Sequence, residues 1–328
     1  MINTIFFVFL ILVELTIINT ILPEKSNEKS FLCVRHTNIL KGIAATMVVC
    51  QHIGGNYGTR VFTPLGGIGV SIFLICSAYG LTKSCEKSGL KEYFKKRFSR
   101  VLIPYWLIVI AYSIINYKDF NIIIFLKQIV LITTTPGGWF VVLIVRLYIL
   151  FYLIKRFIPE KYEIYCYFIL SFTSLIFTKN NLFAEQSFAF FVGIIFAKNN
   201  KNISVKKALK IGITCLIIGG ISLILKQLPQ VREANYIVMN IIQASLKTVT
   251  AVGIIYITYL FLNLRLSNIF IKIGKVSYET YLIHLLILFI IENNKAFSGM
   301  IIYLMLCTIG ILLFKLIGNK IFSFLLHE

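Results

Sequence analysis

Apolar runs of bilayer length recur along almost the whole chain, and this pattern restricts the fold more than any other feature. Apolar residues make up 58% of the 328 residues, charged residues only 14%, and the mean hydropathy is +0.85. A soluble protein needs far more polar surface than this, whereas repeated stretches of about 20 apolar residues are typical of membrane-spanning helices. The sequence therefore predicts an all-α, polytopic transmembrane helix bundle in a lipid bilayer.

We expect about eleven spans in this bundle. The stretch 118–138 carries two lysines and ends in Pro-Gly-Gly, so we interpret it as an interfacial or re-entrant segment rather than a twelfth span. The expected spans are 2–22, 38–57, 66–82, 101–117, 139–154, 162–178, 184–197, 208–225, 237–262, 277–292 and 299–317.

The distribution of basic residues predicts how these spans are oriented. The net charge is +20, which in a soluble chain would suggest nucleic acid as a partner. In a membrane chain, positive charge gathers in the cytoplasmic loops. If loop 83–100 is cytoplasmic, that side holds 23 Lys and Arg against 7 in the opposite loops. We therefore expect an N-terminus outside, a C-terminus in the cytoplasm and no nucleic-acid partner.

Polar residues inside spans are costly, which makes them candidates for function. In the second span, Lys41 and His52 are eleven residues apart. This is close to three helical turns, so both side chains fall on one face, about 16 Å apart. They could hold the two ends of a long donor molecule. Alternatively, Lys41 extends to the inner headgroups and His52 is a packed, hydrogen-bonded residue.

Two further segments combine polar groups at helical spacing. Arg97 and Arg100 are three residues apart at the start of a span, where two guanidinium groups suit a phosphate or an anionic lipid. Ser277, Tyr281 and His284 form one polar stripe on an otherwise apolar helix. His284 is a second catalytic group, or a buried histidine bonded to a neighbour.

The seven cysteines are scattered and show neither a disulfide framework nor the spacing of a metal site. We expect them to serve as small packing residues, and we expect no bound metal.

Four segments, in order, resemble the acyltransferase 3 family of integral membrane O-acyltransferases that act on cell-surface glycans. LKGIAATMVVCQH, with Lys41 and His52, is similar to the family's first core helix. GVSIFLICSAYGL is similar to the second, with Ala78 where glycine is usual. Arg97 to Arg100 resembles the basic entry to the third helix, and IGKVSYETYLIHLLI resembles the late motif with the second histidine.

This resemblance implies a ten-helix acyltransferase core, and the chain departs from the family in two places. It has an additional first span, so we predict one unit at 1–30 and the acyltransferase domain at 31–328. Many members also carry an acidic residue soon after the Trp-Phe pair, whereas Trp139 is followed by Arg146. That difference argues against a mechanism that needs an acidic partner there.

The family resemblance further implies a cell-membrane acyltransferase that transfers an acyl group, most often acetyl, to a sugar hydroxyl of a cell-surface or lipid-linked glycan. The donor would be cytoplasmic acetyl-CoA (acyl-CoA) acting as co-substrate, with no bound cofactor. The implied site residues are His52 and His284 as catalytic groups, Lys41, Arg97 and Arg100 for acyl-CoA, and Arg35, Ser77, Tyr281, Trp139 and Arg146 as orienting groups.

A transporter or flippase of a lipid-linked saccharide is the alternative, because Lys41, Arg146 and Lys247 within spans would also suit an anionic lipid. A glycan polymerase is disfavoured by the short outside loops.

Overall fold

The computed structural model describes residues 30–56, 59–179, 181–199, 203–262 and 265–291, and parts of 302–316. All regular secondary structure within these ranges is helical, which confirms the predicted all-α class. The expected span 2–22 lies outside the described residues, and the expected span 299–317 lies only partly within them.

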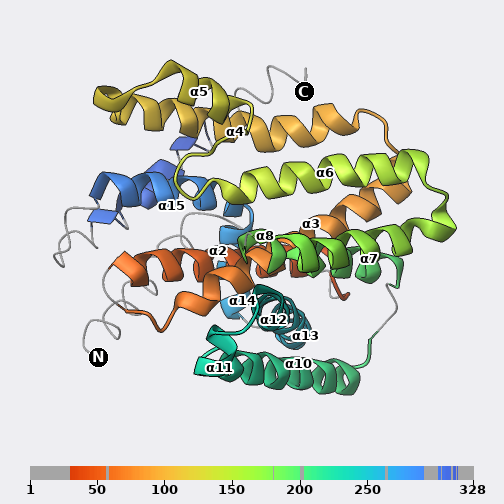
Figure 1. Ribbon diagram of the computed structural model, residues 1–328. Coiled ribbons are helices and arrows are strands. Elements are labelled where there is room, and N and C mark those ends of the chain that lie inside the picture. Colours follow the sequence, from red (N-terminus) through yellow and green to blue (C-terminus); the bar gives the residue numbers. More distant parts are fainter. Residues whose placement is uncertain are drawn as a thin grey trace.

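The long helices pack into one bundle without sharing a single direction (Figure 1). Their apolar side chains face one another in a continuous core, because helices that are apolar on all sides can pack on several neighbours at once. The main elements are α2 (Val34–Asn56), α3 (Thr63–Ser88), α4 (Tyr93–Ile115), α6 (Trp139–Phe157), α7 (Glu160–Phe177), α9 (Ser187–Lys198), α10 (Val205–Leu225), α12 (Tyr236–Ala244), the π-helix η2 (Ser245–Val249), α13 (Thr250–Leu260), α14 (Arg265–Gly274) and α15 (Ser277–Ile291).

Glycines allow the central helices to approach closely. A Cβ atom at Gly69 of α3 would lie 2.7 Å from the Ala44 carbonyl oxygen of α2. Helix α9 packs on α3 in the same way, since a Cβ at Gly193 of α9 would overlap the Ile75 carbonyl of α3. Small residues at such contacts are typical of membrane helix bundles, where packing rather than hydrophobic burial holds helices together.

Helices α2 and α14 make the tightest of these contacts, and it is reciprocal. A Cβ at Gly42 would overlap the Phe270 carbonyl, and one at Gly274 would overlap the Asn38 carbonyl. This contact between α2 and α14 places the start of α15 beside the N-terminal half of α2.

Helices α14 and α15 form a bent pair whose length and composition fit a broken span or a re-entrant loop. They meet at an angle of 75° across a break of a few residues, and only the pair together is long and apolar enough to cross a bilayer. Alone, the 15 residues of α15 measure about 22 Å. The expected span 277–292 is therefore the second half of a bent element.

The stretch 118–138 holds the eight-residue helix α5 (Ile122–Ile129), which is too short to span a bilayer. The Asn121 side chain caps it by accepting bonds from the backbone of Ile123 and Ile124. The Trp106 indole of α4 donates to the Ile129 carbonyl at 3.0 Å and holds α5 against the bundle.

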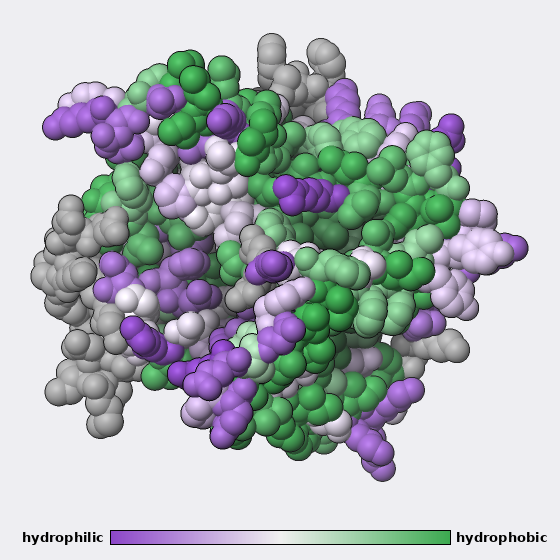
Figure 2. Space-filling model, viewed as in Figure 1, coloured by the Kyte–Doolittle hydropathy of each residue, from purple (hydrophilic) through white to green (hydrophobic). Residues whose placement is uncertain are grey.

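The expected number of about eleven spans is not confirmed. Within the described residues, α3, α4, α10 and the segment Tyr236–Leu260 are long and apolar enough to cross a membrane, and the bent pair would make a fifth. Helices α2, α6 and α7 are 18 to 23 residues long but carry charged or polar side chains. Figure 2 shows a broad hydrophobic surface over α6, α7 and α10, with hydrophilic residues gathered towards the edges.

Candidate active site

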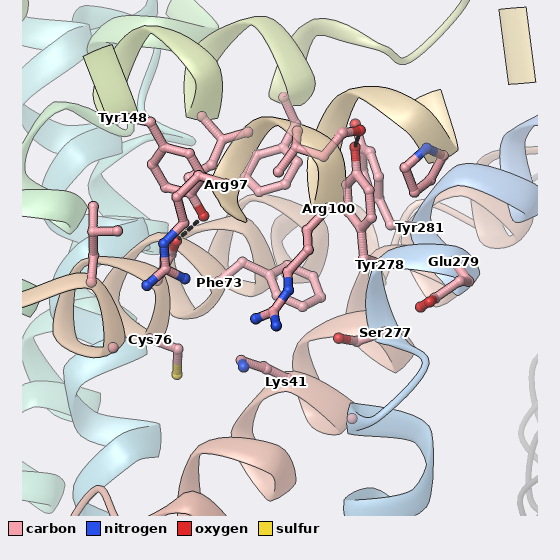
Figure 3. A pocket seen from close by; sticks show the side chains of 18 of the residues that line it. Lys41, Phe73, Cys76, Arg97, Arg100, Tyr148, Ser277, Tyr278, Glu279 and Tyr281 are labelled. Atoms are coloured by element: carbon pink, nitrogen blue, oxygen red, sulfur yellow. Dashed lines mark hydrogen bonds between the residues drawn. The ribbon is translucent and has the colours of Figure 1, made fainter. Parts of the chain in front are cut away.

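A cavity of about 620 Å³ opens between α2, α3, α4, α6 and the break between α14 and α15 (Figure 3). This volume is within the usual range for small-molecule sites. Charged residues in its lining are mostly basic: Lys41, Arg97, Arg100 and Lys275 against Glu279. The cavity therefore suits an anionic ligand.

The basic side chains converge because three helices meet here. Arg97 and Arg100 lie one turn apart on α4, and Lys41 reaches the same space from α2 (Figure 3). The close packing of Gly42 and Gly274 brings Lys275 to the opposite wall. The structure thus brings together the three residues predicted for acyl-CoA.

Ser77 and Tyr148 both line the cavity, and Tyr148 lies beside Arg97 (Figure 3). Their hydroxyl groups are 2.7 Å apart and share a hydrogen bond between α3 and α6. The Tyr93 hydroxyl donates to the Tyr148 carbonyl at 2.9 Å and ties α4 to α6. Ser77 was predicted, whereas Tyr148 carries no motif that would have distinguished it from other tyrosines in apolar helices.

Tyr281 and Phe140 close one end of the cavity. Both side chains line it, and their ring centroids lie 5.1 Å apart. The Tyr281 hydroxyl donates to the Gly137 carbonyl at 2.5 Å. Gly137 has a φ of +75°, a backbone conformation that favours glycine. The same tyrosine therefore ends the cavity and anchors the loop before α6.

The two predicted catalytic histidines lie together behind Tyr281. The rings of His52 and His284 are 5.3 Å apart between centroids, and the His284 ring is 5.7 Å from that of Tyr281. Neither histidine lines the cavity. The structure thus brings α2 and α15 together at a histidine pair beside Tyr281, which itself lines the basic cavity.

The geometry also indicates which nitrogen of His284 is available. Its Nδ1 lies 3.0 Å from the Thr280 carbonyl oxygen, which can only accept, so Nδ1 carries the proton. In the neutral imidazole, Nε2 then has a lone pair. This nitrogen is buried and has no hydrogen-bond partner among the residues that the structure describes. It is positioned to receive a proton or a ligand.

Three predicted orienting residues lie elsewhere. Arg35 donates to the Leu262 carbonyl and to Asn268 Oδ1, so it joins α2 to the α13–α14 region. Trp139 and Arg146 of α6 do not line the cavity. They contact Phe183 of the four-residue helix α8 (Asn181–Ala184) instead.

Sequence reasoning missed a buried polar cluster between α3, α9 and the π-helix. Lys247 forms an ion pair with Glu185, and both side chains are almost fully buried. Beside them, Gln186 accepts from Ser71 at 2.7 Å and donates to the Gly67 carbonyl at 2.9 Å. The only signal was Lys247 within an expected span, since its partner belongs to a segment 62 residues away.

The sequence also matches a known family. A model of an acyltransferase domain, that of the acyltransferase 3 family, matches residues 37–320, a range that includes the histidine pair and every cavity residue named above. No curated protein and no solved structure matches the chain. A family match over so much of the sequence is decisive: this chain belongs to the acyltransferase 3 family of membrane acyltransferases.

Proposed function

We propose that this membrane acyltransferase transfers an acyl group, acetyl in the first instance, from cytoplasmic acyl-CoA to a hydroxyl group of a cell-surface or lipid-linked glycan. One observation carries the proposal: a basic cavity ends at Tyr281, and a pair of histidines lies directly behind that residue. The cavity supports a charged donor, and the histidines support proton transfer from an alcohol.

The charge of the cavity supports acyl-CoA as the donor. The nucleotide end of CoA carries several phosphate charges, and Arg97 and Arg100 offer the fork-shaped donors that bind phosphate well. Lys41 lies further along the same space. On the predicted topology this end faces the cytoplasm, where acyl-CoA is found, and CoA acts as a co-substrate rather than a resident cofactor.

The pantetheine arm would extend from these cations along the cavity towards Tyr281 and Phe140. A rotation of the Tyr281 ring would admit the thioester to His52 and His284, because that ring contacts both the cavity and His284. The acceptor would approach the same pair from the outer side.

In the reaction that we propose, His52 acts as general base and removes the proton of the acceptor hydroxyl. The oxygen attacks the thioester carbonyl carbon, the carbon–sulfur bond breaks, and the CoA sulfur leaves with the proton. His52 would hold the proton between these steps, and His284, fixed by its bond to Thr280, would orient the His52 ring beside it. A covalent acyl-histidine on the same pair is a variant with the same residues.

Inside-out membrane vesicles and labelled acetyl-CoA would test this function. We expect CoA-dependent label on extractable glycan or glycolipid, and its loss in His52→Ala. The absence of label across several acceptors, together with movement of a lipid-linked saccharide, would favour the transporter or flippase instead.

A further inference from the structure

A charged side chain lies exposed on an apolar face of α6. Arg146 is exposed, and the residues that follow it on the same stripe of the helix are hydrophobic and exposed as well, with Ile149 at 39% and Leu153 at 42%. The surface of α6 is largely hydrophobic (Figure 2). An arginine that faces lipid is costly, so its presence calls for an anionic partner or for access to the headgroups.

The guanidinium group points back towards the start of the helix. Its Cζ atom lies 5.5 Å from the centre of the Phe183 ring. The same ring lies 6.3 Å from that of Trp139, the first residue of α6. Side chains on a helix tilt towards its N-terminus, which explains this direction. Trp139 at a helix end is typical of the membrane interface, so Arg146 reaches headgroup depth.

No carboxylate in the described ranges lies within ion-pair distance of Arg146. Glu185, two residues beyond Phe183, pairs with Lys247 instead. The contact with Phe183 leaves the planar edges of the guanidinium group for hydrogen bonds, and these donors fit a phosphate in two-point contact. The anion must therefore come from outside this part of the protein.

We propose that Arg146, with Phe183 and Trp139, is a docking site for the phosphate of the lipid that carries the glycan acceptor. This inference rests on the proposed function for the identity of the acceptor. Arg146 lies exposed beside the exposed apolar side chains of Ile149 and Leu153, and such a surface favours a lipid phosphate over a soluble one. On the predicted topology, the start of α6 faces outside, which is the side from which the acceptor would approach.

The fold also connects this surface to the histidines. Phe140, the residue after Trp139, contacts Tyr281, and Tyr281 contacts His284. A phosphate held at Arg146 would therefore leave its attached saccharide on the acceptor side of the histidine pair.

Lipid binding to the purified full chain in phosphatidylcholine nanodiscs would test the site. The probes are a photoreactive long-chain polyprenyl monophosphate and, in parallel, photoreactive phosphatidylglycerol. We expect Arg146→Gln to weaken cross-linking of the polyprenyl phosphate about tenfold, as the loss of one charge-assisted contact predicts. Arg146→Lys keeps the positive charge and should retain part of the binding. This result would show that Arg146→Gln weakens binding through loss of charge rather than through misfolding. Lys127→Gln, which removes an exposed cation of α5, serves as the matched control and should bind normally.

Unchanged polyprenyl phosphate binding in Arg146→Gln would overturn the inference, and so would equal, Arg146-dependent binding of phosphatidylglycerol. His52→Ala separates this inference from the proposed function. It should bind the polyprenyl phosphate normally whether or not it acylates, so acylation by His52→Ala would contradict the catalytic assignment and leave the lipid site standing.

Discussion

The imidazole rings of His52 and His284 lie 5.3 Å apart, although 231 residues separate them in the chain and different helices, α2 and α15, carry them. Their proximity depends on the bend between α14 and α15, because the end of α14 lies against Asn38 near the start of α2 and α15 begins three residues later. The candidate active site is thus a property of the fold rather than of either helix.

Substitution of either histidine should abolish acylation. We expect His52→Ala and His284→Ala each to lower transfer of labelled acetyl by about a hundredfold or more, the usual contribution of general acid–base catalysis. Amounts of protein in the membrane should stay normal, as judged by immunoblotting. His327→Ala removes a histidine near the C-terminus and should transfer normally. Normal transfer by His52→Ala would contradict the assignment.

Loss of cavity cations should weaken donor binding rather than chemistry. Arg97→Gln and Arg100→Gln each remove a charged donor from the cavity, and a charge-assisted hydrogen bond contributes about 1.5–3 kcal/mol. We expect the KM for acetyl-CoA to rise about tenfold or more, with a smaller change in kcat. The exposed Lys87→Gln tests for general charge effects and should leave KM unchanged. A fall in kcat with an unchanged KM would show that these residues act in the chemical step and not in donor binding.

The contact between α2 and α14 should tolerate no added methyl group. Gly42→Ala would drive a Cβ atom into the Phe270 carbonyl, and overpacking of this kind costs about 1–3 kcal/mol. We expect a lower thermal unfolding temperature in detergent. Gly220→Ala on α10 meets nothing within 4 Å and should be neutral or stabilising. If the two variants unfold at the same temperature, α2 and α14 can move apart at little cost and the close contact does not limit stability.

The Glu185–Lys247 pair should show strong coupling. Glu185→Gln leaves the Lys247 ammonium buried without its counter-charge, which costs about 3–5 kcal/mol. The double variant Glu185→Gln/Lys247→Met removes both charges and should recover much of the stability. A double-mutant cycle on thermal unfolding measures the coupling, and additive losses would show that the pair contributes little.

Local spacing predicted much of the site. The three-residue interval of Arg97 and Arg100 places both in the cavity, and the eleven-residue interval on α2 gives a cation in the cavity and a histidine beyond it. Non-local contacts were not predictable. The bond from Tyr281 to Gly137 joins segments 144 residues apart.

Arg146 shows a different limit of sequence reasoning. In a soluble helix, polar residues mark the exposed face, but both faces of a membrane helix are apolar, so periodicity could not indicate that Arg146 faces outwards. The number of spans is not confirmed, and the bend between α14 and α15 was not predictable, since an apolar run of span length does not show where its helix breaks.

The position of Tyr281 has a consequence for which part of the acyl donor crosses the membrane. The Tyr281 ring lines the basic cavity and also contacts His284, and its hydroxyl group donates one hydrogen bond to the Gly137 carbonyl. On the proposed mechanism, the donor from the cytoplasm and the acceptor from the outer side would meet at this ring, so CoA itself need not cross the membrane. Only the acyl group would then leave the cytoplasm.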